Sequence, residues 1–200
     1  MTDSGTGTKM PEPPKAGRKT AIAEVAASGP EGSQAGFWAF SLSLYDRPGA
    51  AQACLALQDR FGADVNLLLL GFWRARRGYA GWADAELGRV ESAVAPVNAV
   101  LQPLREARRG LKSLCEIEPT ADALYAEIKA LELKLEQVAQ VWLAAASRVG
   151  PAQRSAKSPP DRDDEIEAAA VHLAAYLERI AAGDQAALQL GADLLRIAFS

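Results

Sequence analysis

The clearest pattern in the chain is a repeat of apolar residues between positions 120 and 148. They recur at alternating steps of four and three, the spacing that keeps side chains on one face of a helix. These residues form a heptad seam: Leu124, Ile128, Leu131, Leu135, Val138, Trp142 and Ala145. Thr120 is placed to cap this helix, with Asp122 in its first turn. Because about three heptads are marginal for a free-standing coiled coil, we expect the heptad seam to pack in an intramolecular antiparallel bundle.

A second pattern is the continuous apolar run that begins at Leu67, in the stretch ADVNLLLLGFW. Asp64 follows a terminating Gly62 and precedes the run, so its carboxylate is placed to cap the helix start. Asn66 falls in the first turn, where unpaired N–H groups also need acceptors. Leu67 to Leu70 cover every side of a helix, which predicts a central helix that is buried all round.

The end of this helix combines arginines with aromatic residues, and it is the best candidate for a binding site. Gly78 ends the helix after a basic stretch, where positive charge compensates the helix dipole. Guanidinium groups beside tryptophans can also bind a phosphate, an RNA or an acidic protein segment. The candidate binding residues are Trp73, Arg74, Arg76, Arg77 and Trp82. The alternative, dipole compensation with core packing, is the preferred interpretation of this composition.

The remaining patterns predict an all-α fold, a compact multi-helix bundle with a C-terminal helical hairpin. Further helices are expected within residues 37–45, 48–62 and 83–115. Pro96 and Pro103 predict that the longest of these is interrupted or kinked. Composition divides the chain into a disordered N-terminal tail, a helical domain, a linker and a C-terminal helical pair, with boundaries at 1–35, 36–148, 149–163 and 164–199.

Charge and cysteine content narrow the class of protein. The net charge of −3 gives no overall attraction to nucleic acid, so we do not expect a nucleic-acid partner. Residues 37–115 hold 10 Lys or Arg against 7 Asp or Glu, and residues 116–200 hold 8 against 14, so the two halves can dock. Cys54 and Cys115 lie in helical patterns without a CxxC spacing, which indicates a reducing compartment. With no secretory segment and no membrane-spanning run, a cytoplasmic location without membrane insertion is predicted.

Catalytic chemistry finds little support in the residue pattern. His172 is the only histidine, with no metal ligand at helical spacing, so we expect a partly buried or surface imidazole. The acidic cluster at residues 161–165 opens onto a helix, where carboxylates favour the N-terminus, and no second acidic motif completes a Mg²⁺ site. We therefore predict no catalytic residues, no metal and no cofactor.

Three blocks in residues 37–73 are specific enough to suggest a family: FW.FSL.LY, RPG.A.ACLALQD and GADVNLLL. They resemble the signature region of a family of short, helical, proteobacterial proteins known as a conserved domain of unknown function. The resemblance continues more loosely to residue 148. It implies a compact cytoplasmic helical protein, and it assigns no catalytic residue to this chain.

Two hypotheses for function remain. The first is a non-enzymatic helical interaction module that binds a protein partner, or itself, through the heptad seam or the arginine-flanked aromatic loop. The second is a small-molecule-binding protein or enzyme, with a pocket near Phe37, Trp38, Trp73 and Trp82 and polar groups from Asp46, Arg47, Asp59 and Arg60. Convergence of Asp59, Asp64 and Asn66 inside an enclosed cavity would favour the second hypothesis.

Overall fold

The computed structural model describes residues 34–147 and 161–200, and in these ranges the chain forms helices joined by turns, with no β-strand. The prediction of an all-α fold is confirmed. The helices are α2 (Gln34–Tyr45), α3 (Ala50–Phe61), α4 (Val65–Arg76), α5 (Asp84–Cys115), α6 (Ala121–Ala146), α7 (Arg162–Ala181) and α8 (Gln185–Ala198). The expected tail and most of the predicted linker lie outside the described residues, and the domain boundaries stay a prediction.

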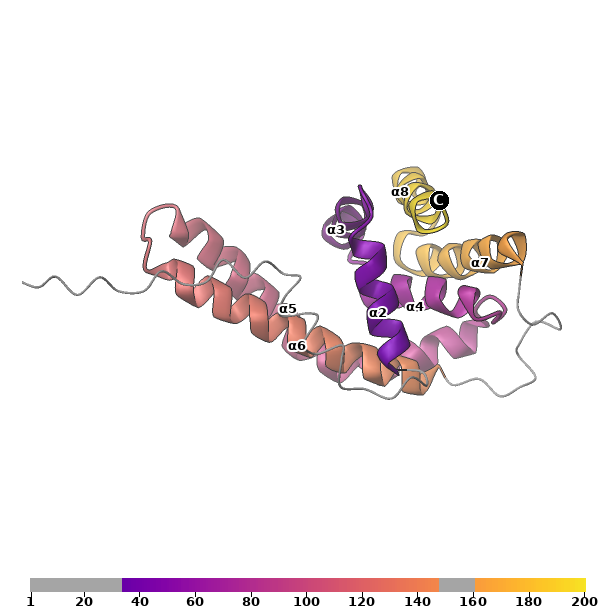
Figure 1. Cartoon of the computed structure of the whole chain (residues 1–200), viewed down its shortest axis with the longest axis horizontal. Helices are drawn as coiled ribbons and strands as arrows, with labels where there is room; N and C mark the ends of the chain where they lie inside the picture. The colour runs from indigo at the N-terminus through magenta and orange to yellow at the C-terminus, as the bar shows by residue number, and fades with distance from the viewer. Residues whose placement is uncertain (1–33, 148–160) are drawn as a thin grey trace, which may run out of the picture.

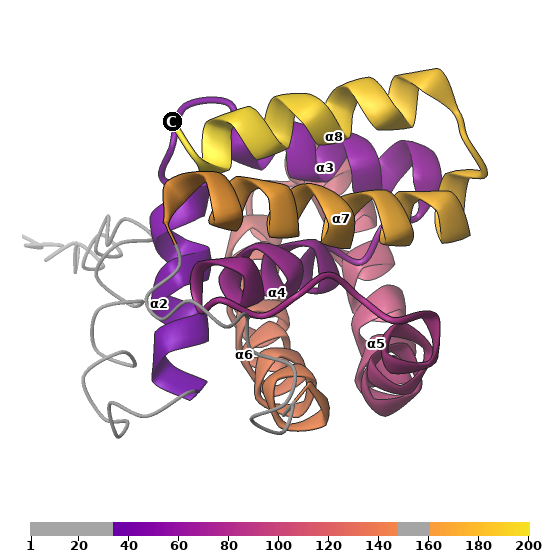
Figure 2. The same ribbon diagram turned by 90° about the vertical axis from the view of Figure 1, so that its right-hand side faces the viewer.

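The helices are arranged as a cluster from which one long hairpin extends. The hairpin is made by α5 and α6, which pack along each other, and it reaches away from the cluster of the other helices (Figure 1). At the centre of the cluster, α4 contacts α2, α3, α6 and α7. Figure 2 shows α4 between α7 and the α5–α6 hairpin, with α3 and α8 side by side on the far side of α7. None of the described helices has the length and apolarity needed to cross a membrane.

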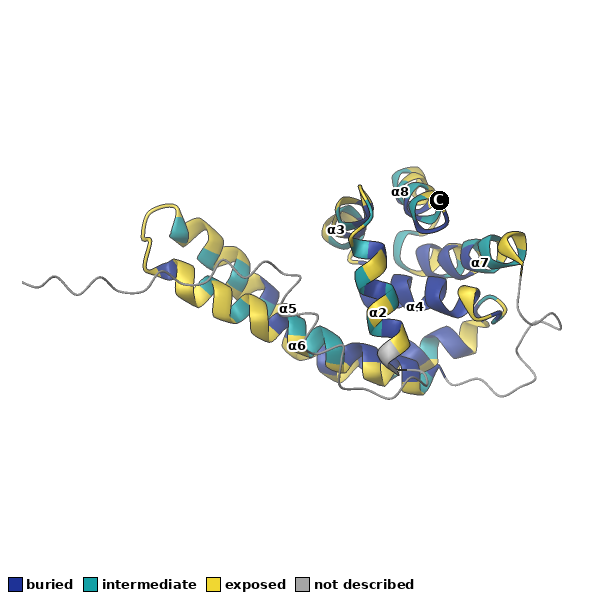
Figure 3. Ribbon diagram, viewed as in Figure 1, coloured by how far each residue is buried: buried dark blue, intermediate teal, exposed yellow. Residues whose placement is uncertain are grey.

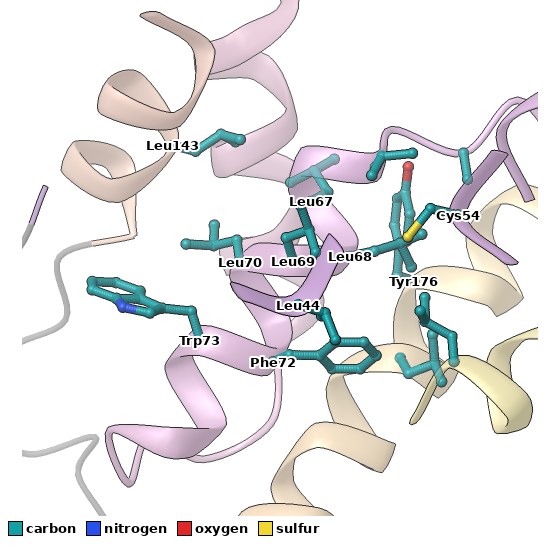
Figure 4. Packing of buried hydrophobic residues seen from close by; sticks show 14 of the residues in the cluster. Leu44, Cys54, Leu67, Leu68, Leu69, Leu70, Phe72, Trp73, Leu143 and Tyr176 are labelled. Atoms are coloured by element: carbon teal, nitrogen blue, oxygen red, sulfur yellow. The ribbon is translucent and has the colours of Figure 1, made fainter. Parts of the chain in front are cut away.

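The central position of α4 was predicted from its sequence, and the structure confirms it. Asp64 accepts a hydrogen bond from the Asn66 backbone N–H at 2.9 Å and so caps the helix. Every residue from Val65 to Ala75 is buried, and the four leucines point in different directions into the core (Figure 4). Fully burying one leucine contributes roughly 1.5–3 kcal/mol, so the run from Leu67 to Leu70 anchors the cluster.

The C-terminal hairpin of α7 and α8 packs onto the main bundle, a point that the sequence left open. Asp161 caps α7 and Asp184 caps α8, each through hydrogen bonds from backbone N–H groups in the first turn. Helix α7 then lies against α4, and α8 lies against α3. Gly191 permits the close approach of the two helices, since a Cβ there would lie 2.6 Å from Leu177 Cδ1. The hairpin therefore shares the core of the preceding helices.

Helix α5 is continuous, which excludes an interruption at its prolines, one of the two predicted alternatives. Pro96 and Pro103 both lie inside the helix and both are exposed. Each proline removes the hydrogen bond to the carbonyl four residues earlier, at Ser92 and Ala99. These two residues are exposed as well, so water can replace the missing donors and the helix continues.

Helix α6 forms where it was predicted, but the heptad seam does not face the interior. The buried residues of α6 lie on the neighbouring side of the helix: Ala121, Glu132, Ala139, Gln140, Leu143 and Ala144. The expectation that the heptad seam packs inside the chain is therefore wrong for most of its length. Thr120 occupies the N-cap position, but its hydroxyl donates to Glu118 Oε1 instead of capping the helix backbone.

Polar contacts explain why this side of α6 is buried. The Gln140 side chain donates to Asn66 Oδ1 on α4 at 2.9 Å and to Ser41 Oγ on α2 at 3.0 Å. Along the hairpin, Arg105 of α5 lies against Glu132 and Glu136 of α6. Since buried polar groups need partners, these contacts turn the side that carries them inward and leave the apolar seam on the outside.

Candidate functional site

Arg74, from the predicted binding site, lies at the end of α4 in a closed setting. Its side chain is 2% exposed, and its Nη1 lies 3.0 Å from Glu86 Oε1 at the start of α5. The same nitrogen donates to the Ser147 carbonyl at the end of α6, at 2.9 Å. The guanidinium carbon lies 4.5 Å from the ring centroid of Trp82 and 5.1 Å from that of Tyr79. Arg74 thus joins the ends of α4 and α6 to the start of α5.

The charge of Arg74 is compensated inside the protein. Burial lowers the pKa of the guanidinium below its ordinary value, and the Glu86 carboxylate opposes that shift. An arginine keeps its proton in proteins, so Arg74 and Glu86 form a buried ion pair. The Glu86 carboxylate therefore neutralises the positive charge that would otherwise attract a phosphate or an acidic peptide.

His172, on α7, completes the packing beneath the loop that carries Trp82. The imidazole is 1% exposed, so it is buried fully and not partly as expected, and it meets the Trp82 ring edge-on at a centroid distance of 4.8 Å. Gly71 of α4 allows this approach, since a Cβ there would lie 3.0 Å from His172 Cβ. Burial, and secondarily the charge of Arg74, lowers the pKa of His172 to about 3. His172 is therefore neutral at pH 7 and acts as a packing residue.

Arg76 turns away from Arg74 toward the end of α8. Its Nη2 donates to the Ala198 carbonyl at 3.1 Å, where Arg47 Nη1 also donates at 3.0 Å. Arg162 donates to the next carbonyl, that of Phe199. The last carbonyls of a helix lack intrahelical donors and carry partial negative charge. These three arginines therefore form a clamp on the C-terminal end of α8, which we call the α8 clamp.

Arg77 and Trp73 form a third, separate arrangement. The Arg77 guanidinium carbon lies 4.9 Å from the Trp73 ring centroid, and the Trp73 ring packs on Phe37 at a centroid distance of 5.3 Å. Arg77 itself is exposed. The structure thus brings Arg74 together with Trp82, and Arg77 together with Trp73, but not all five residues of the predicted binding site into one surface.

The three polar residues whose convergence would favour a pocket point to separate partners. Asp64 caps α4 and accepts a second hydrogen bond from Asn98 Nδ2 at 2.7 Å. Asn66 accepts from Gln140, and Asp59 is an exposed residue 3.8 Å from Arg109. These contacts close a helix end, link two helices and form a surface ion pair, so the three side chains do not share an enclosed cavity.

A surface pocket lies beside the α8 clamp and shares Arg47 with it. It has a volume of about 360 Å³, and its lining residues are Arg47, Pro48, Arg196, Ile197 and Ser200. The aromatic residues expected around a ligand pocket are absent from this lining. Within the described ranges, no group of three or more His, Cys, Asp or Glu side chains is placed to hold a metal ion.

The exposed part of the heptad seam is a row of large apolar side chains that contacts among the described residues leave uncovered. Leu124, Leu131, Val138 and Trp142 are 54%, 50%, 41% and 43% exposed. We call these four residues the α6 stripe. Val141 lies next to its C-terminal end and is also exposed. Figure 3 shows the exposed residues along α6, where the hairpin leaves the buried centre of the cluster.

Several residues that build these sites were not identified from the sequence. Glu86 and Ser147 hold Arg74, and Arg162 belongs to the α8 clamp, as does Arg47, which the sequence named only for a pocket. Their partners are distant along the chain, so no local spacing connects them. A usable signal was the position of Glu86 in the first turn of α5, where the helix dipole favours a carboxylate. That turn follows the short loop after Arg74.

The comparisons with known proteins give one result. Residues 36–143 match a family model described as protein of unknown function, DUF2390. No curated protein and no solved structure matches the chain. The matched range begins in α2 and includes the Arg74–Glu86 pair and the α6 stripe, and it ends before α7. It covers more than half of the chain, so this protein belongs to the DUF2390 family of proteins of unknown function.

Proposed function

We propose that the protein is a non-enzymatic helical interaction module that binds a polypeptide through the α6 stripe. The observation that carries this proposal is the exposure of a heptad seam whose spacing is typical of helix–helix contacts. A soluble protein rarely leaves a continuous row of large apolar side chains uncovered unless the row contacts something.

Covering the stripe contributes several kcal/mol toward association, against the cost of losing translational and rotational freedom. Fully burying a large apolar side chain contributes roughly 1.5–3 kcal/mol. The four residues of the α6 stripe are about half exposed, so covering each adds roughly 1 kcal/mol. A helix that docks along the stripe also covers its aliphatic neighbours, which raises the total.

The arginine-flanked aromatic loop remains a second predicted contact surface. The α6 stripe is the better candidate, because two of the three arginines in this region already bind groups inside the protein. Arg74 already pairs with Glu86, and Arg76 binds the end of α8. Arg77 lies over the Trp73 ring and is exposed, and neither of these two contacts involves it. We do not propose an enzymatic or small-molecule function, because Asp59, Asp64 and Asn66 serve separate structural contacts.

The proposal includes a cytoplasmic location in a proteobacterium. Cys54 and Cys115 are both free, as is typical of a reducing compartment. The resemblance of residues 37–73 to a proteobacterial family supports the bacterial origin. The net charge of −3 favours a protein partner over nucleic acid.

Site-specific photo-crosslinking in cells that make the protein tests this function. A photoreactive phenylalanine analogue replaces Leu131 in the stripe, and in a matched control it replaces Leu188, an exposed leucine of α8. We expect a defined polypeptide adduct from position 131 that is lost when Val138→Glu is added, and none from position 188. Equal labelling at both positions, or no adduct at position 131, would refute the proposal.

A further inference from the structure

The α6 stripe is accompanied by charges on one edge only. Glu127 and Lys134 are exposed, lie seven residues apart and follow the same side of the stripe. Seven residues are two helical turns, so these two side chains lie one above the other along the helix. This edge therefore presents one negative and one positive charge at a fixed separation.

The opposite edge of the stripe is unavailable to a partner. At the equivalent heptad positions on that side stand Tyr125, Glu132 and Ala139. Glu132 binds Arg105 and Arg108 of α5, and Ala139 is fully buried. A helix that docks on the stripe can therefore form charge pairs along the Glu127–Lys134 edge only.

This asymmetry determines how a second copy would fit. In a parallel pair of helices, one edge of the first helix faces the opposite edge of the second, which here is covered by α5. In an antiparallel pair related by a two-fold axis, each edge faces the same edge of its partner. Only the antiparallel arrangement brings Glu127 close to Lys134 of the other copy and Lys134 close to its Glu127.

We propose that the polypeptide bound by the α6 stripe is a second copy of this chain, packed antiparallel with the two-fold axis at Leu131. This inference rests on the proposed function and names its partner. The register places Leu124 opposite Val138 of the second copy and pairs Leu131 with its own counterpart. Apolar residues thus meet from Leu124 to Val138, while both Glu127–Lys134 pairs form at the edge of the stripe.

The same register also places Trp142 at the far end of the second α6. That helix begins after the turn at residues 116–120, where Ile117 is 80% exposed. The distance from Leu124 to Trp142 along the helix is about 27 Å at 1.5 Å per residue. An axis at Leu131 therefore pairs the stripe from Leu124 to Val138 and places the Trp142 indole opposite residue 120, near the exposed turn of the partner hairpin.

Charge reversal in the full-length chain tests the pairing by sedimentation equilibrium. Glu127→Lys and Lys134→Glu each turn two attractive pairs into two repulsive ones, and we expect each to weaken dimerisation about ten-fold. The double variant Glu127→Lys/Lys134→Glu restores opposite charges and returns the dissociation constant to within about two-fold of wild type. Lys129→Glu is the matched control, since Lys129 lies on the other side of α6 near Tyr125, and it leaves dimerisation unchanged.

Disulfide trapping tests the orientation separately, in a Cys115→Ser background. Leu124→Cys and Val138→Cys are each expected to give little crosslinked dimer alone, because each faces the other position in the second copy. An equimolar mixture of the two variants gives the crosslinked dimer. Efficient crosslinking of Leu124→Cys with itself would show a parallel pair and would overturn the proposal.

These outcomes separate this inference from the proposed function. A wild-type protein that stays monomeric up to roughly 0.5 mM overturns the inference. If position 131 then crosslinks a different polypeptide, the interaction module stands with another partner. If position 131 gives no adduct either, both proposals fail. Failure of the double charge variant to recover dimerisation overturns the antiparallel register alone.

Discussion

Arg74 on α4 and Glu86 on α5 form an ion pair, 3.0 Å long between Nη1 and Oε1, with side chains only 2% and 6% exposed. The pair spans the loop that carries Tyr79 and Trp82, whose rings lie against the guanidinium. The pair therefore closes this part of the core. Substituting either residue tests how much the buried ion pair contributes to stability.

Glu86→Ala is expected to lower the free energy of unfolding by about 3–5 kcal/mol, because it leaves the Arg74 charge buried without compensation. Urea denaturation measures this loss. The double variant Arg74→Met/Glu86→Leu removes both charges and keeps apolar volume, so it recovers most of the stability. Arg196→Ala, which breaks the exposed pair with Asp193, is the control and changes the midpoint little. A double variant less stable than Glu86→Ala would contradict this account.

The stability of the protein should fall as the pH drops below about 6.5, the ordinary histidine pKa. Burial lowers the pKa of His172 to about 3 in the folded chain, so the unfolded chain binds a proton that the folded chain does not. The stabilisation is complete above pH 6.5 and decreases by up to about 1.4 kcal/mol per pH unit toward pH 3.

Chemical denaturation of wild type and His172→Phe at pH 7 and pH 5 measures this contribution. Other titrating groups are common to both proteins, so the difference between the two pH dependences reports on His172. We expect wild type to lose about 2 kcal/mol more than the variant over this interval. Equal losses in the two proteins would show that His172 is protonated as readily when folded.

Two glycine substitutions should change stability in opposite directions. A Cβ at Gly81 would lie 2.1 Å from Val171 Cγ1 and 2.8 Å from its Cβ, so Gly81→Ala forces a backbone or side-chain shift that costs about 1–3 kcal/mol. At Gly110, inside α5, nothing lies within 4 Å of the added atom. Gly110→Ala should therefore stabilise the helix by about 0.5–1 kcal/mol.

Thermal and urea unfolding of both glycine variants check these signs. Adding Val171→Ala to Gly81→Ala removes the clashing methyl groups and recovers part of the lost stability. If Gly81→Ala alone is neutral, the close packing of the 77–83 loop on α7 is not present in solution.

The two thiols should react at very different rates. Cys54 is fully buried, and burial raises the pKa of its thiol to about 12. Cys115 lies at the end of α5 and is partly exposed. Because the thiolate is the reactive species, an alkylating agent at pH 8 should modify Cys115 in the native protein and Cys54 only after unfolding. Mass spectrometry of the modified peptides shows the order, and early labelling of Cys54 would contradict the packing of α3.

Local features of the sequence predicted the individual helices well. Gly62 ends α3 in the left-handed conformation, with φ of 69°, and Asp64 caps α4 two residues later. The leucine run predicted the burial of α4 on all sides. These features act between residues within a turn of each other, so the chain order contains them directly.

The candidate site was predicted only in part. Arg74 and Trp82 do lie together, but Glu86, Ser147 and His172 complete their surroundings from three other places in the chain. The sequence grouped the three arginines into one candidate binding site, with dipole compensation as the preferred interpretation, whereas their side chains reach a carboxylate, a helix end and an indole. Long side chains from one turn can diverge by many ångströms, and only the surrounding helices decide which partner each one meets.

Helix α6 shows the division between sequence and tertiary structure most directly. Its heptad spacing determined by itself that one face of the helix carries a continuous row of apolar residues. The tertiary structure decided that this row lies outside, because Gln140, Glu132 and Glu136 on the adjacent side find partners on α2, α4 and α5. Periodicity acts along a single helix, but burial depends on which distant segments can match its polar groups, and no pattern within α6 contains that information.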